Sequence, residues 1–132
     1  MRAPRFLRLL LLMLTAALLL VGVRGEARCE FSCANVNDRV KCAEMGRDMM
    51  LESLNCRLFP DSTFLYPGGR LKVLVAGTRC SARLRTPLRQ MYIHCQELKS
   101  RLDDVIRQCV HTGGGGGWDT SRSGWAWGVS AC

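Results

Sequence analysis

The sequence has none of the short motifs that accompany common enzyme chemistry. It contains no G-x-S-x-G elbow for a serine nucleophile, no H-E-x-x-H zinc motif and no phosphate-binding P-loop. The five glycines at residues 113–117 are not followed by the Lys-Ser or Lys-Thr pair that a P-loop requires. We therefore expect a protein that is not an enzyme, that has no catalytic residues and that uses no cofactor.

Histidine is scarce, and the cysteines do not form repeated close pairs. The two histidines are His94 and His111. His94 precedes Cys95, but neighbouring residues in a helix point about 100° apart, which argues against a Cys–His nucleophile. Structural zinc favours repeated C-x-x-C pairs. The closest cysteines here, Cys29 and Cys33, have no matching second pair, so no metal site is expected.

Long hydrophobic runs are limited to one segment near the N-terminus. Residues 9–23 are apolar apart from one threonine, follow three arginines and end at an expected cleavage site with the small residues Val23 and Gly25. This order is typical of a secretory signal peptide. The run is shorter than the roughly 20 residues of a membrane span. We expect residues 1–25 to be removed, which leaves a secreted, extracellular protein without a membrane span; an uncleaved signal anchor is the alternative.

The cysteines all follow the expected cleavage point. Removing residues 1–25 takes away four of the 19 basic residues and none of the 11 acidic ones, so the net charge falls from +8 to +4. Eight cysteines in a small exported chain predict a disulfide framework, each bond contributing about 2–4 kcal/mol. An unpaired cysteine would allow a covalent dimer. The expected disulfide cysteines are Cys29, Cys33, Cys42, Cys56, Cys80, Cys95, Cys109 and Cys132.

Apolar residues recur every three or four positions over residues 86–109. This spacing predicts a long amphipathic helix. Thr86 can cap its start, and Pro87 suits the first helical position. The glycines from Gly113 onward end it.

A second helix is predicted for residues 37–57. Apolar residues again recur at helical spacing, and Asn37 or Asp38 can act as the N-cap. Gly46 would weaken the middle of this helix by about 1 kcal/mol relative to alanine.

The cysteine spacing links the two helices. Cys42 and Cys56 are fourteen residues apart, and so are Cys95 and Cys109. Each pair would span about 21 Å along one helix face, too far for a disulfide within the helix. Antiparallel helices would place Cys42 against Cys109 and Cys56 against Cys95, and we favour this arrangement. Parallel helices would exchange the partners, and chance spacing is the third possibility.

The connection between the helices contains two β-prone runs. Residues 64–66 and 71–75 flank a Pro-Gly-Gly turn and predict a short hairpin. Cys80 follows, where it can tether the hairpin to Cys29 or Cys33. The predicted fold class is mainly α: residues 26–111 form a disulfide-stapled domain of two long helices with a hairpin between them.

Residues 112–132 differ in composition from the rest. Five glycines precede Trp118, Trp125 and Trp127, and no periodicity follows. Oligoglycine is typical of a flexible spacer, so a flexible tail is expected. The alternative is a Trp-rich contact segment that Cys132 holds in place.

Basic residues are concentrated between residues 57 and 89, where seven basic residues accompany one acidic residue. In an exported protein, this clustering indicates a sulfated glycosaminoglycan, an anionic lipid or an acidic receptor face as the partner, whereas nucleic acid is not expected. The alternative is a solvated surface with no partner. The candidate binding residues are Arg70, Lys72, Arg79, Arg83, Arg85 and Arg89.

Two short segments resemble secreted factors. Residues 51–56, together with Arg79, Cys80 and Cys95, resemble a stretch of stanniocalcin, a helical hormone. Residues 65–71 resemble a segment of the meteorin factors. Each resemblance covers a minority of the chain and assigns no site residue, but both point toward secreted signalling proteins.

These observations favour a secreted signalling ligand, similar to a cytokine or growth factor, that binds a cell-surface receptor or another extracellular protein. Glycosaminoglycans would retain it near the cell surface. One alternative is a carrier that holds an apolar ligand between its helices. Another is a host-defence or inhibitory protein. The carrier pocket would be lined by Met45, Met49, Met50 and Leu51.

Overall fold

The computed structural model describes residue 5 and residues 7–11, 27–31, 38–120 and 126–131. Most of the predicted signal peptide lies outside these residues, as do Cys33 and Cys132. Within the described part, no helix has both the length and the apolar character needed to cross a membrane. The main elements are β1 (Ala27–Phe31), α2 (Arg39–Ser53), β2 (Thr63–Tyr66), β3 (Gly69–Leu74), β4 (Ser81–Thr86), β5 (Met91–His94), α3 (Cys95–Val105), the π-helical turn η1 (Ile106–Val110), β6 (Gly116–Asp119) and β7 (Ala126–Ser130).

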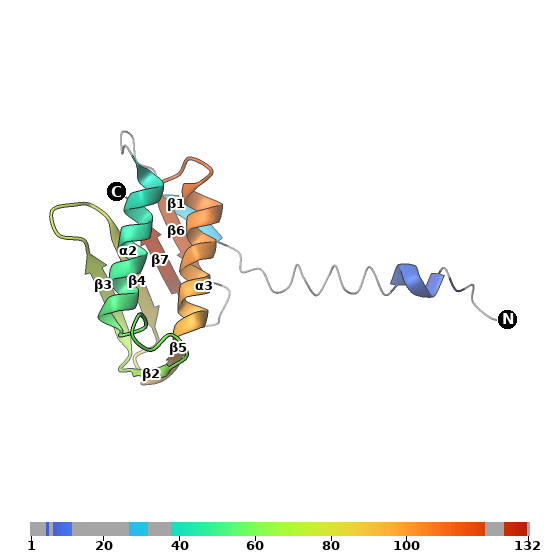
Figure 1. The fold of residues 1–132 in the computed structure, drawn as a ribbon, viewed down its shortest axis with the longest axis horizontal. Helices are drawn as coiled ribbons and strands as arrows, with labels where there is room; N and C mark the ends of the chain where they lie inside the picture. The colour runs from blue at the N-terminus through green and yellow to red at the C-terminus, as the bar shows by residue number, and fades with distance from the viewer. Residues whose placement is uncertain (1–4, 6, 12–26, 32–37, 121–125, 132) are drawn as a thin grey trace.

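Five strands form an antiparallel sheet, and α2 and α3 cover one of its faces (Figure 1). The strand order is β1-β6-β7-β4-β3, so the last two strands of the chain lie inside the sheet. β2 and β5 form a separate two-stranded sheet. Of the described residues, 34% are in strands and 37% in helices, so the mainly α fold predicted from the sequence is wrong and the protein is mixed.

The sequence predicted that this helix begins at Thr86, but α3 begins at Cys95. The preceding residues form β5, in which Ile93 is buried and Tyr92 is exposed. Over so few residues, the spacing of apolar side chains suits a strand as well as a helix, and pairing with β2 selects the strand. The amphipathic pattern holds within α3 itself, whose buried side chains include Leu98, Leu102 and Val105.

The helix α2 is shorter than the predicted helix of residues 37–57. It follows Asp38, which has a left-handed φ of 61° and makes no side-chain capping hydrogen bond. The other predicted cap, Asn37, lies outside the described residues. Gly46 is buried in the middle of α2, against the backbone of Ser81 in β4. This contact holds the helix close to the sheet.

The described cysteines form three disulfides: Cys29–Cys109, Cys42–Cys80 and Cys56–Cys95. Their Cα atoms are 5.2, 5.2 and 5.3 Å apart, in that order. The predicted Cys56–Cys95 bond is therefore present. The predicted Cys42–Cys109 bond and the predicted tether from Cys80 to Cys29 or Cys33 are wrong. The reason is the sheet, because β4 brings Cys80 beneath α2 and β1 brings Cys29 to η1.

The two helices lie side by side and run antiparallel (Figure 1). The Cys56–Cys95 disulfide joins the turn that follows α2 to the first residue of α3. Farther along the two helices, an Arg47 nitrogen of α2 donates a hydrogen bond to an Asp103 oxygen of α3 at 2.8 Å. Partial burial alone would lower the pKa of Arg47, but hydrogen bonds and charge from Asp103 and then Asp48 raise it. The guanidinium therefore stays charged between the helices.

The predicted hairpin does not form. β2 and β3 do flank the Pro-Gly-Gly turn, but β2 pairs with β5, and β3 pairs with β4. Gly68 has a φ of 91°, and a Cβ there would lie 2.7 Å from the carbonyl oxygens of Pro87 and Arg89. The turn is therefore packed against the segment that follows β4. The strands on its two sides belong to different sheets.

The segment expected to be a flexible tail supplies the interior strands β6 and β7. A Cβ at Gly117 would overlap the carbonyl of Arg28 in β1, and a Cβ at Gly116 would overlap that of Val129 in β7. The glycines therefore allow neighbouring strands to approach closely and do not act as a spacer. Trp127 of β7 is fully buried in the core.

Candidate anion-binding site

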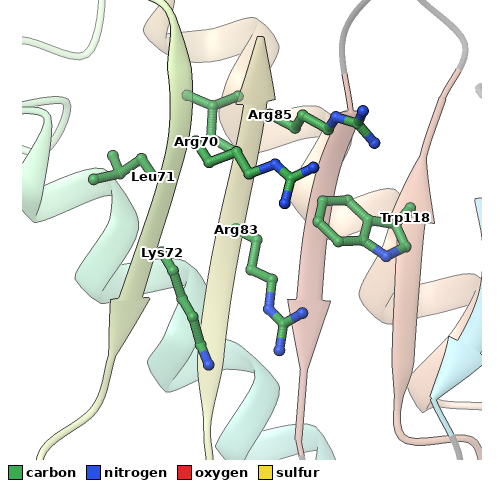
Figure 2. A pocket seen from close by; sticks show the side chains of 7 residues that line it. Arg70, Leu71, Lys72, Arg83, Arg85 and Trp118 are labelled. Atoms are coloured by element: carbon green, nitrogen blue, oxygen red, sulfur yellow. The ribbon is translucent and has the colours of Figure 1, made fainter.

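The helices leave one face of the five-stranded sheet uncovered, and we call it the open face. In β4, Leu84 is buried on the helix side, so strand alternation turns Arg83 and Arg85 the other way. The same alternation in β3 places Arg70 and Lys72 on the open face. Figure 2 shows these four basic side chains projecting together from adjacent strands.

The basic residues of β3 and β4 stand directly opposite one another. Arg70 pairs with Arg85 in the strand register, and Lys72 pairs with Arg83. Like charges in directly opposite positions destabilise a sheet. Among the described residues, none of these four side chains forms an ion pair. An anionic ligand would supply the missing counter-charge.

The register extends this arrangement across the whole sheet. Arg83 in β4 is opposite Gly128 in β7, Gly128 is opposite Trp118 in β6, and Trp118 is opposite Arg28 in β1. Lys72 completes the row at the β3 edge. One continuous cross-strand row therefore combines three basic side chains with an indole, and Gly128 adds no side chain between them.

An irregularity in β1 adds an aromatic ring to the open face. Between Arg28 and Phe31, β1 advances three residues, while β6 advances two from Trp118 to Gly116. Such a β-bulge lets residues three apart share one face. The rings of Phe31 and Trp118 have centroids 6.4 Å apart, and Cζ of Arg83 lies 5.4 Å from the Phe31 centroid. The bulge thus brings Phe31 into a cation–π contact.

Two hollows on the open face share Trp118 and Arg85. Glu30 is the one carboxylate among the described residues that line them, against five basic side chains. Both hollows therefore suit an anion. The larger, of about 340 Å³, is lined by Arg70, Leu71, Lys72, Arg83, Leu84, Arg85 and Trp118 (Figure 2). The smaller, of about 190 Å³, is lined by Arg28, Glu30, Arg85, Trp118, Thr120 and Ala126.

The structure brings together four of the six predicted binding residues. Arg79 lies in the turn between β3 and β4, and Arg89 follows β4. Both are exposed, and neither lines the two hollows. They therefore stand at opposite ends of β4 and apart from the paired basic residues of the open face.

Sequence reasoning missed part of this site. Arg28 has no basic neighbour within three residues on either side along the chain, and Phe31 gave no pattern of its own. Trp118 entered only through the alternative of a Trp-rich contact segment. No local signal could have placed Arg28 beside Trp118, because the two are ninety residues apart and meet through strand pairing.

The residues suggested for an apolar carrier pocket are divided between core and solvent. Met50 and Leu51 are buried in the core, whereas Met45 and Met49 are 37% and 38% exposed. Because the four side chains are split between core and surface, the structure offers no support for the carrier alternative at this position.

The described residues contain no group of three or more His, Cys, Asp or Glu side chains that could hold a metal ion. In comparisons with known proteins, no family model matches the chain, and no curated protein or solved structure matches it significantly. The candidate site therefore rests on its geometry and charge.

Proposed function

We propose that this protein is a secreted factor that binds sulfated glycosaminoglycans through its open face. The observation that carries the proposal is the pair of directly opposed basic residues, Arg70 with Arg85 and Lys72 with Arg83. Guanidinium groups present forked donors that suit oxyanions such as sulfate. A sheet face is also extended enough for a linear polymer to lie across several strands.

The disulfides support an extracellular location. Three bonds link described cysteines, and such bonds persist mainly in oxidising compartments. Together with the predicted signal peptide, they favour export. An exported basic face meets sulfated polysaccharide more readily than nucleic acid.

The role as a signalling ligand needs a second surface for a receptor. Leu65 in β2 and Tyr92 in β5 stand directly opposite each other and are 47% and 67% exposed. Exposed apolar side chains in such a pair favour a protein partner. The double variant Leu65→Ser, Tyr92→Ser should therefore bind less to cells that carry the proposed receptor and should keep its retention on heparin. Equal loss of both would contradict two separate surfaces.

Affinity chromatography on heparin tests the main proposal. The triple variant Arg70→Gln, Lys72→Gln, Arg85→Gln should elute at a lower salt concentration than the native protein. A matched control removes the same charge from exposed positions on the helices and η1, with Lys41→Gln, Lys99→Gln and Arg107→Gln. A sulfonate cation exchanger provides the second control. If both triple variants lose the same retention on heparin, the open face is not the binding site.

A further inference from the structure

We infer that Trp118 is a sugar-stacking platform, so that the open face recognises its ligand as a sulfated carbohydrate and not only as a polyanion. The inference rests on the proposed function and deepens it. It names the part of the ligand that the basic residues cannot recognise, namely the sugar ring. It also assigns a role to Trp118, the aromatic side chain that lines both hollows among the described residues.

The indole of Trp118 lies flat over β7 (Figure 2). A Cβ at Gly128 would come within 2.8 Å of Cε3 and 2.9 Å of Cδ2 of the indole. One face of the ring system therefore rests on bare backbone, which supports it without a side chain. The residue is half-buried, and its other face is turned outward.

An outward aromatic face suits the C–H groups of a pyranose ring. The face of an aromatic ring carries negative charge density, and the C–H groups of a sugar carry partial positive charge. The equatorial substituents of a stacked sugar radiate outward from the edge of the sugar ring, roughly parallel to the indole. Sulfate and carboxylate groups on that edge would then extend over the neighbouring hollows.

Basic side chains lie on both sides of the indole. Arg85 lines both hollows, Arg83 and Arg70 line the larger one, and Arg28 lines the smaller one. A sugar on Trp118 would therefore find guanidinium groups on either side, whereas a featureless polyanion would gain nothing from the indole.

Single-stranded nucleic acid also stacks on aromatic residues between basic side chains. We favour carbohydrate because the three disulfides fit the proposed extracellular location, where sulfated carbohydrate is more abundant than nucleic acid. Nucleic acid becomes an outcome of the test below.

The experiment separates stacking from charge by measuring Kd over a range of NaCl concentrations. The ligands are a defined heparin octasaccharide, a polyvinyl sulfate of similar charge that has no sugar rings, and a single-stranded RNA of similar charge. Trp118→Ala should weaken octasaccharide binding about 2- to 12-fold at every salt concentration and leave polyvinyl sulfate binding unchanged. The slope of log Kd against log salt should stay the same.

Arg85→Gln serves as the contrasting variant. It should reduce the slope of log Kd against log salt concentration by about one for both octasaccharide and polyvinyl sulfate. The reason is that the variant has one cation fewer to displace counterions from the ligand. Trp118→Phe keeps an aromatic face and should retain most of the octasaccharide affinity. If Trp118→Ala does not fold, the octasaccharide should still change the fluorescence of the native protein, and the signal should be absent in Trp118→Phe.

The outcomes distinguish the two proposals. If the native protein binds neither octasaccharide nor polyvinyl sulfate, the proposed function fails. If it binds both, and Trp118→Ala weakens neither or weakens both equally, only the stacking inference fails. A loss of RNA binding larger than the loss of octasaccharide binding overturns it in favour of a base-stacking platform.

Discussion

Gly46 of α2 lies so close to Ser81 of β4 that a Cβ at position 46 would come within 2.7 Å of the Ser81 carbonyl carbon and oxygen. By helix propensity alone, alanine would stabilise this position by about 1 kcal/mol. The structure reverses that expectation, because the neighbouring atoms belong to backbone that cannot rotate away.

We therefore predict that Gly46→Ala lowers the free energy of unfolding by about 1–3 kcal/mol, as overpacked core substitutions do. Urea denaturation measures the effect. Met49→Ala, at a position 38% exposed on the same helix, is the control and should change stability by less than about 0.5 kcal/mol. A stabilised Gly46→Ala protein would show that α2 does not pack on β4 at Ser81.

Gly128 allows a second test, on the open face. Gly128→Ala should displace the indole of Trp118, lower the free energy of unfolding by about 1–3 kcal/mol and weaken heparin octasaccharide binding. The displaced indole should also shift its fluorescence to longer wavelength. Ala126→Ser, on the same strand and face, is the control. Unchanged fluorescence in Gly128→Ala would contradict the contact between residues 118 and 128.

The disulfide pattern is testable by proteolysis and mass spectrometry of the non-reduced protein. We expect peptides linked through Cys29–Cys109, Cys42–Cys80 and Cys56–Cys95. Replacing Cys42 and Cys80 together by alanine should lower the free energy of unfolding by about 2–4 kcal/mol, because the bond closes a long loop of the unfolded chain. A peptide that links Cys42 to Cys109 would restore the helix-to-helix connection that the sequence suggested and would contradict this fold.

The burial of Tyr66 should make the free energy of unfolding depend on pH in the alkaline range. Burial raises the pKa of the Tyr66 phenol above its ordinary value of 10.0. The folded state then holds the proton more tightly than the unfolded state. The contribution of this group to stability is therefore fully present below about pH 10. The free energy of unfolding should fall as pH rises above about 10, until the phenol in the folded protein has also ionised.

Urea denaturation of native protein and Tyr66→Phe at several alkaline pH values measures this effect. The variant should lose less stability than the native protein as pH rises. Tyr92→Phe is the matched control, since Tyr92 is 67% exposed, and it should behave like the native protein. Parallel curves for all three proteins would contradict the burial of the Tyr66 phenol in the folded state.

Part of the candidate site could be predicted from local sequence. Arg70, Lys72, Arg83 and Arg85 lie on consecutive strands joined by a short turn, so their proximity in the chain already implied proximity in space. The alternating residues 81–86 also contained a strand signal that sequence analysis did not use. Short-range pairing of this kind depends on neighbours along the chain, which is why clustering of charge was informative.

The sequence by itself determined that the cysteines form disulfides, that one helix buries the face of Leu98, Leu102 and Val105, and that basic residues gather in one region. Only the tertiary structure decided that residues 91–94 form a strand and that the glycine-rich segment lies inside the sheet. It also decided that Trp118 lies beside arginines more than thirty residues away in the chain. The physical reason is that strand pairing joins distant segments through backbone hydrogen bonds and close packing, and no short window of sequence contains both partners.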